Sequence, residues 1–307
     1  MVKWVNIAKG IAIFLVVYGH VIEGLAEGGY MFASYEVQHG IIYAFHMPLF
    51  FFLSGLFLTK ILGREFTTVL KSKALTLLYP YFLWGIIQGS IMAILSKFTN
   101  GGGGWEKVIL LPIDPFGQFW YLYDLFFMTL LFYGLNKLLK NKNLVLLVSM
   151  ILFILTPLMS GWEFSRIFHH FIFLVLGSLF FKYEQWFDSY RYWVISALTV
   201  ISGVAFYSNL ELLKFLAYGL LGTVLTIVVS RVVKANLSLE FLGKKSLSIY
   251  LFHILAIAGS RIILTKFLGF TNIPSLIVIL TIAGTLFPLV VDYIATKLRM
   301  TKFIYGK

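Results

Sequence analysis

Two ionisable residues, Lys9 and His20, lie in the first apolar stretch of the chain, KGIAIFLVVYGH. A charged side chain in hydrocarbon costs at least ~2.5 kcal/mol on insertion scales, so such residues are expected to have a function. At ~100° per residue, a spacing of eleven places both side chains on one face of a helix, about 16 Å apart along its axis. We therefore predict a polar path through a membrane, which faces protein or water rather than lipid.

Histidine is the first candidate for acid–base chemistry, because imidazole takes and gives a proton near neutral pH. His46 and the pair His169–His170 are expected in the outer half of the membrane, as His20 is. Glu23 lies one helical turn beyond His20 and could orient its imidazole as the acid of a catalytic triad does. The alternative is that these histidines hydrogen-bond neighbouring helix backbones, and that Glu23 is an exposed residue at the outer interface.

Other polar residues in apolar stretches have simpler interpretations. Asp124, in FWYLYDLFF, needs a partner or a wet cavity. Asp292 is expected to pair with a nearby base such as Lys297. Ser54 lacks the GxSxG setting of a nucleophile, and its small side chain suggests a close contact between two helices. The chain has no cysteine, no HExxH motif and no carboxylate cluster of ligand spacing, so no metal site is predicted.

The composition predicts the elements that must position these residues. Of the 307 residues, 60% are hydrophobic and only 12% are charged, whereas soluble domains carry about 25% charged residues. We predict an all-α, polytopic membrane bundle of about ten helices. Apolar windows near the required ~20 residues fall at about 4–24, 39–59, 74–96, 119–139, 143–160, 166–182, 192–209, 212–230, 246–265 and 275–296.

The distribution of basic residues predicts the orientation. Eighteen of the 25 Lys and Arg residues fall at the N-terminus and in every second loop, six fall in the opposite loops, and one lies within a span. Because positive residues mark cytoplasmic loops, both termini are expected in the cytoplasm. The net charge of +12 therefore reflects topology and not nucleic-acid binding. The glycine run 101–104, on the opposite side, is either a lid or a plain connector.

Four segments resemble the membrane acyltransferases of the acyltransferase-3 type, in particular the fucose 4-O-acetylase-like and polysaccharide O-acyltransferase branch. They are KGIAIFLVVYGH at 9–20, FHMPLFFFLSG at 45–55, FWYL at 119–122 and SLSIYLFH at 246–253. The resemblance implies a single domain, 1–307, in the bacterial cytoplasmic membrane. It also implies transfer of an acyl group, usually acetyl, from cytoplasmic acetyl-CoA to a hydroxyl of a surface or lipid-linked glycan.

The same resemblance assigns roles to individual residues. It makes His20 essential and gives Lys9, which is commonly Arg in the family, a phosphate- or thioester-binding role. It also carries over the pair Ser54–Gly55 and a late Tyr-x-x-His motif, here Tyr250 and His253. Many relatives carry a fused hydrolase-like domain. This chain is expected to carry out the whole transfer in the bundle or to pass the acyl group to a separate protein.

These observations combine into one mechanistic hypothesis. Acyl-CoA would meet a basic cluster after the second span, formed by Lys60, Arg64, Lys71 and Lys73, which could equally be ordinary topology charges. His20, with Glu23 and His46, would act as general base or would briefly accept the acyl group. The glycan would enter from the outer side, near Tyr30, Trp120, Tyr121, Asp124, His169 and His170. The alternatives are a glycan exporter or flippase without acyl chemistry, and a non-catalytic scaffold.

Overall fold

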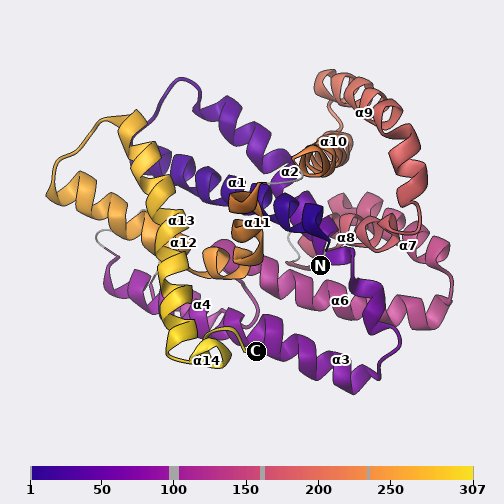
Figure 1. Ribbon diagram of the computed structural model, residues 1–307, viewed down its shortest axis with the longest axis horizontal. Helices are drawn as coiled ribbons and strands as arrows, with labels where there is room; N and C mark the ends of the chain where they lie inside the picture. Colours follow the sequence, from indigo (N-terminus) through magenta and orange to yellow (C-terminus); the bar gives the residue numbers. More distant parts are fainter. Residues whose placement is uncertain (1, 97–103, 160–162, 234–235, 307) are drawn as a thin grey trace. The chain divides into compact units, whose positions relative to one another are not determined.

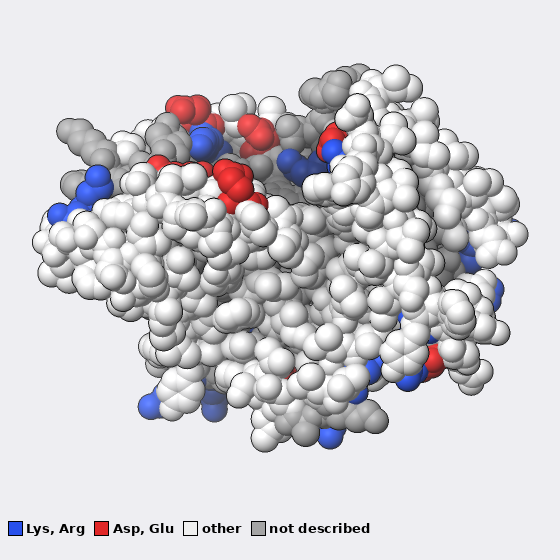
Figure 2. All heavy atoms as spheres, turned by 90° about the horizontal axis from the view of Figure 1, so that it is seen from above, with Lys and Arg blue, Asp and Glu red and all other residues white. Residues whose placement is uncertain are grey.

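The computed structural model describes residues 2–96, 104–159, 163–233 and 236–306, and contains no strand within these ranges. Eight helical segments in the described part are long and apolar enough to cross a membrane. The protein is therefore an all-α, multi-pass membrane protein, as predicted. Most of the face in Figure 2 carries neither acidic nor basic side chains, as expected of a surface that contacts lipid. The question of a glycine lid concerns residues that lie, except for Gly104, outside the described ranges.

The expected spans correspond to helices, with two differences. The window at 166–182 falls in a shorter apolar helix, and the window at 192–209 falls in a helix that does not meet the criteria for a span. That helix begins EQWFDSYRYW, and its charged and polar residues lower its hydropathy. The total of ten spans and the cytoplasmic termini stay predictions.

The chain divides into two compact units, which we describe separately. Unit 1 comprises Met1–Ala8, Tyr43–Lys73 and Asp124–Asn236, and unit 2 comprises Lys9–Ile42, Ala74–Tyr123 and Leu237–Lys307. Helices α1 (Lys3–Glu27) and α2 (Tyr35–Gly55) contribute to both units. The other helices of unit 1 are α3 (Phe66–Lys73), α6 (Trp120–Leu139, from Asp124), α7 (Lys142–Leu155), α8 (Glu163–Phe180), α9 (Glu184–Tyr207) and α10 (Glu211–Val232), with the short turns η1 (Leu58–Ile61) and η4 (Thr156–Met159).

Unit 1 contains a close helix crossing between α2 and α8. A Cβ atom on Gly55 would lie 2.0 Å from the carbonyl oxygen of Leu174, and one on Gly177 would lie 2.0 Å from that of Phe52. Only glycine allows two backbones to approach this closely, as small residues do in packed membrane helices. The predicted small-residue contact at the Ser54–Gly55 pair is therefore present.

Unit 2 is built around the neighbouring helices α12 and α13, which lie side by side in Figure 1. Gly10 lets α1 approach the backbone of α11 at Leu239, and Gly284 lets α13 pack against Ile257 of α12. The elements of this unit are α4 (Tyr79–Ile94), α5 (Glu106–Ile109), α11 (Leu237–Lys244), α12 (Ser246–Ile262), α13 (Ile273–Lys297) and α14 (Thr301–Tyr305), with η2 (Ala74–Leu78), η3 (Gly117–Phe119) and η5 (Ile263–Phe267).

The partner predicted for Asp292 is wrong. Its carboxylate lies 2.6 Å from the Lys245 ammonium and accepts a hydrogen bond of 2.7 Å from the Tyr305 hydroxyl, whereas Lys297 is exposed. A residue five positions further along a helix is rotated by about 140°, so Lys297 faces away from Asp292. The lysine that pairs with Asp292 lies 47 residues earlier in the chain, where no spacing rule could identify it.

Candidate active site

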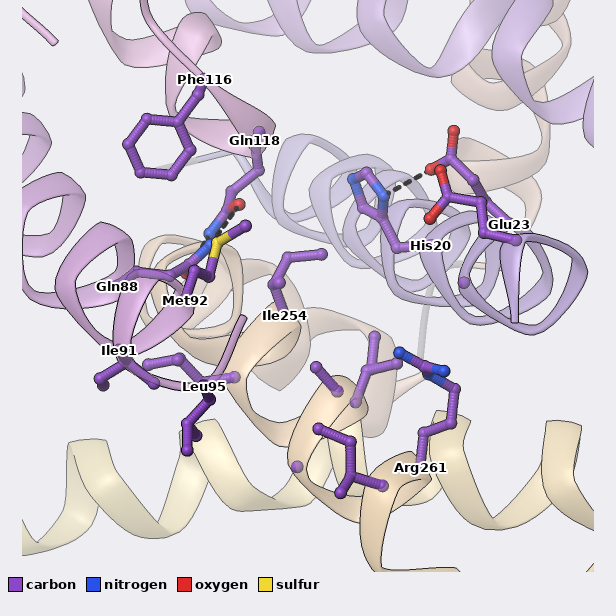
Figure 3. A pocket seen from close by; sticks show the side chains of 18 of the residues that line it. His20, Glu23, Gln88, Ile91, Met92, Leu95, Phe116, Gln118, Ile254 and Arg261 are labelled. Carbon is purple, nitrogen blue, oxygen red and sulfur yellow. Dashed lines mark hydrogen bonds and ion pairs between the residues drawn. The ribbon is translucent and has the colours of Figure 1, made fainter. Parts of the chain in front are cut away.

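A cavity of about 370 Å³ lies within unit 2 and contains His20 (Figure 3). Its walls come from the C-terminal turns of α1, the end of α4, the segment around η3, and α12. Most of the lining is apolar, with a few polar groups among it, which is typical of a small-molecule site. The polar and charged side chains that line it are His20, Glu23, Glu27, Gln88, Lys107, Gln118 and Arg261.

The His20 imidazole is bound to a carboxylate from its own helix. Its Nδ1 atom lies 3.0 Å from Oε2 of Glu23, as Figure 3 shows. Because a carboxylate oxygen only accepts, Nδ1 carries the proton in this bond, and the lone pair of the neutral ring is on Nε2. The contact expected one helical turn beyond His20 is therefore present. It leaves the imidazole in the tautomer that a general base needs.

A second imidazole contacts the same carboxylate. Nε2 of His39, near the start of α2, lies 3.8 Å from Oε1 of Glu23. Glu23 thus bridges two histidines that are nineteen positions apart in the sequence. The predicted span at 39–59 begins at His39, but the sequence does not indicate this contact, because a pairing across a loop depends on tertiary structure.

His253 of α12 lies beside His20, with ring centroids 5.2 Å apart. It is completely buried, and its Nδ1 is within 3.0 Å of the backbone carbonyl oxygens of Ile249 and Tyr250. Carbonyl oxygens only accept, so Nδ1 carries a proton and Nε2 is an acceptor. Within the described part of the chain, this buried Nε2 has no hydrogen-bond partner. It is a neutral acceptor next to His20.

The opposite wall of the cavity is held by a reciprocal pair of buried amides. The Gln118 amide donates to Gln88 at 2.9 Å, and the Gln88 amide donates back at 3.3 Å. The Tyr250 hydroxyl donates to the backbone carbonyl of Gln118, and the Tyr250 ring packs edge-on against Tyr121 at 5.7 Å. The two predicted tyrosines therefore support this wall.

Sequence reasoning missed five groups at the cavity, namely Gln88, Gln118, Glu27, Lys107 and Arg261. Gln88 and Gln118 could have been identified from the sequence, since a glutamine inside an apolar run needs a hydrogen-bond partner just as a charged residue does. Arg261 is one of the six basic residues assigned to the opposite loops, although it lies within the apolar run of α12. Its burial shows that it does not lie in a solvated loop.

Unit 1 contains a separate polar cluster. Asp124 is completely buried, and its two carboxylate oxygens accept from the Arg166 guanidinium at 2.8 and 3.2 Å. This is the partner that Asp124 was expected to need. His170 contacts the backbone carbonyl of Arg166 at 2.9 Å, and both His169 and His170 pack against the Phe215 ring. The substrate-binding role predicted for Asp124, His169 and His170 stays a prediction.

The remaining predicted site residues are distributed as follows. His46 is buried in unit 1, where its ring packs edge-on against Tyr43 at 4.8 Å. Lys9 is half-buried on α1 and does not line the cavity, and Ser54 is half-buried on α2. Tyr30 and Trp120 are half-buried in unit 2. The basic cluster, all in unit 1, is exposed at Lys60, Arg64 and Lys71 and half-buried at Lys73.

Comparison with known families tests the resemblance directly. Residues 2–293 match the family model described as an acyltransferase domain. The chain belongs to the acyltransferase-3 family. This confirms the resemblance carried by the four quoted segments and places the chain among acyltransferases.

Two curated relatives align with part of the chain, and both are named nodulation protein NolL. The protein of Mesorhizobium japonicum is 28% identical over 126 residues, which cover 39% of this chain and 32% of the relative. The protein of Sinorhizobium fredii is 29% identical over 140 residues, which cover 44% and 37%. The aligned part thus spans about a third of the length of these relatives. No solved structure matches the chain.

Proposed function

We propose that this protein transfers an acyl group, most simply acetyl, from acyl-CoA to a hydroxyl of a cell-surface or lipid-linked glycan. The observation that carries the proposal is the bond between His20 Nδ1 and Glu23 Oε2 in the wall of a cavity. A carboxylate beside Nδ1 supports the tautomer in which Nδ1 is protonated and Nε2 acts as the base. Membership of an acyltransferase family supplies the reaction class.

In the direct route, Nε2 of His20 takes the proton of the glycan hydroxyl while its oxygen attacks the thioester carbonyl carbon. The carbon–sulfur bond then breaks, and the imidazolium returns the proton to the departing CoA thiolate. Glu23 stabilises the imidazolium between these steps, as a triad carboxylate does. Every proton taken up is given back, so the site regenerates itself in each turnover.

In the second route, Nε2 of His20 attacks the thioester carbonyl carbon, the carbon–sulfur bond breaks, and the CoA thiolate departs with the proton that Nδ1 gives up through Glu23. The acyl-imidazole then passes its acyl group to the glycan hydroxyl, whose proton restores the starting site. The two routes differ in one measurable respect. Only the second releases CoA and labels a His20 peptide when acetyl-CoA carrying an isotopic label is supplied without acceptor.

The donor is proposed to approach through the basic cluster of unit 1. Lys60, Arg64 and Lys71 are exposed, so their charges are available to the phosphates of CoA. Lys9 shares a helix with His20, and eleven residues bring it back to nearly the same face. This placement supports a role for Lys9 in guiding the pantetheine arm or its phosphate toward His20.

The acceptor is proposed to reach the cavity from the opposite side of a bacterial cytoplasmic membrane. Tyr30 follows α1, which ends at Glu27, and Trp120 follows Gln118 of the cavity wall, so both rings are near the ends of elements that line the site. Aromatic faces of this kind stack on sugar rings. They also anchor membrane proteins at the interface, a role that needs no glycan.

The proposal is tested with the purified protein in lipid nanodiscs, supplied with acetyl-CoA and glycan acceptors. Replacement of His20 by Ala is expected to abolish transfer while the amount of folded protein in the membrane stays unchanged. Transfer retained by His20→Ala would refute His20 as the base. In cells, loss of the protein is expected to leave exported but unacylated glycan, whereas glycan retained inside the cell would support an exporter.

A further inference from the structure

Arg261 is a buried cation in the last turn of α12. Only 5% of its surface is exposed, and the helix around it is apolar. A guanidinium is charged at all relevant pH values and presents five N–H donors. Burial of such a group is costly unless a partner compensates its charge and accepts its hydrogen bonds.

The described part of the chain does not supply that partner. Within it, the Arg261 guanidinium makes no hydrogen bond and no ion pair. The nearby acidic groups that interact with its charge are Glu27 and Tyr30, and neither is within ion-pairing distance. Glu27 is itself exposed to solvent. The guanidinium therefore has unused donors, although it lines the cavity that contains His20.

The position of the guanidinium shows which part of a substrate it would meet. One of its terminal nitrogens lies 2.9 Å from the place where a Cβ atom of Gly28 would be. Gly28 is eight residues beyond His20, or about 12 Å along the axis of α1. Figure 3 shows His20 and Arg261 from different helices around one cavity. The guanidinium therefore lies beside the chain just after α1, about two helical turns beyond the backbone of His20, and this place suits a group of the acceptor other than its reacting hydroxyl.

We propose that Arg261 binds an anionic group of the acceptor glycan, either the carboxylate of an acidic sugar or a phosphate. This inference rests on the proposed function, because it assumes that a glycan occupies the cavity. Carboxylate and phosphate both match the fork of a guanidinium, which can donate two parallel hydrogen bonds to either. A neutral acceptor places no negative charge against this guanidinium, so Arg261 selects acidic acceptors over neutral ones.

The test measures binding in nanodiscs without acyl-CoA, with matched pairs of probes that differ only in charge. One pair is an oligosaccharide that contains glucuronate and its carboxyl-reduced counterpart. The other is an oligosaccharide linked to an isoprenyl diphosphate and the same oligosaccharide linked to the isoprenyl alcohol. One charged probe is expected to bind about 10- to 100-fold more tightly than its neutral partner, and the pair that shows the difference identifies carboxylate or phosphate.

Variants then assign the preference to Arg261. Arg261→Gln should remove the preference, and Arg261→Lys should keep part of it, because charge remains but the fork is lost. Lys266→Gln is the matched control, since it removes one positive charge from an exposed residue at the same end of the helix. Gly28→Ala should weaken the preference without changing any charge, because its methyl group displaces the guanidinium.

Two results would overturn the inference. One is equal binding of the charged and neutral probes by the unmodified protein in both pairs. The other is a preference that survives in Arg261→Gln. His20→Ala should keep the preference while losing acyl transfer, which separates this inference from the proposed reaction. Absence of acyl transfer in the unmodified protein, with the preference intact, would refute only the proposed reaction.

Discussion

Replacement of Glu23 isolates the contribution of the carboxylate that holds His20. Glu23→Leu removes the acceptor at nearly constant size, and Glu23→Gln keeps a neutral acceptor in place of a charged one. A hydrogen bond to a charged group contributes ~1.5–3 kcal/mol. The two side chains are 23% and 31% exposed, and solvent screening favours the lower end of that range, ~1.5–2 kcal/mol.

This free energy predicts the order of the rates. Since ~1.4 kcal/mol is a factor of ten, kcat should fall about 10- to 30-fold in Glu23→Leu. It should fall about two- to fivefold in Glu23→Gln, which keeps a neutral bond of ~1 kcal/mol and so loses only ~0.5–1 kcal/mol. The KM for acetyl-CoA should not change, because the carboxylate contacts the imidazole and not the donor. Initial rates of acetyl transfer in nanodiscs measure both constants.

Glu36→Gln is the matched control, because it removes a carboxylate from an exposed position on α2 that does not line the cavity. Its rate should equal that of the unmodified protein. The reasoning is refuted by a Glu23→Leu rate within twofold of the unmodified protein while His20→Ala is inactive. It is equally refuted by a Gln variant slower than the Leu variant, since that order would assign the effect to shape and not to hydrogen bonding.

Three further predictions concern unit 1. Gly55→Ala should lower the melting temperature and the folded yield, because its Cβ would lie 2.0 Å from the Leu174 carbonyl oxygen. The control Gly203→Ala should change neither, because nothing lies within 4 Å of its Cβ. Equal melting temperatures for the two variants would contradict this prediction. Asp124→Asn should destabilise the protein by about 3 kcal/mol in thermal unfolding, because it leaves the Arg166 charge without its partner. The double variant Asp124→Leu with Arg166→Met removes both charges and should recover most of the loss. An Asp124→Asn variant as stable as the unmodified protein would show that the ion pair is dispensable. Replacing the four residues of the basic cluster by Gln should raise the KM for acetyl-CoA and weaken the salt dependence of that KM. Replacing Lys137, Lys140 and Lys142 by Gln should change neither. Equal changes in KM for the two sets would indicate that the cluster only determines topology.

Local features of this protein could be predicted from the sequence. The apolar windows identified helices because each window is long enough to cross a bilayer by itself. The contact of His20 with Glu23 followed from a three-residue spacing within one helix. The close contact of α2 at Gly55 could be predicted from a small residue in an apolar run, although the sequence did not identify α8 as the helix that α2 contacts.

Contacts between distant segments could not be predicted in this way. The Gln88–Gln118 pair joins residues 30 positions apart, and the bond from Lys245 to Asp292 spans 47. Neither spacing corresponds to a periodicity of a helix, so only the packing of whole elements brings these residues together. His253 was expected within the span at 246–265, but its proximity to His20 depends on how α12 packs against α1.

The amide pair of Gln88 and Gln118 has a consequence for engineering. Neither side chain titrates, and each satisfies the other, so this wall of the cavity does not depend on His20 and Glu23, the groups of α1 that are proposed to transfer the proton. Reshaping its apolar neighbours Ile91, Met92 and Phe116 would alter the room for the proposed acceptor and leave the proposed base, His20, unchanged. Retargeting the enzyme to new acceptors should therefore begin on α4 and the segment before α6.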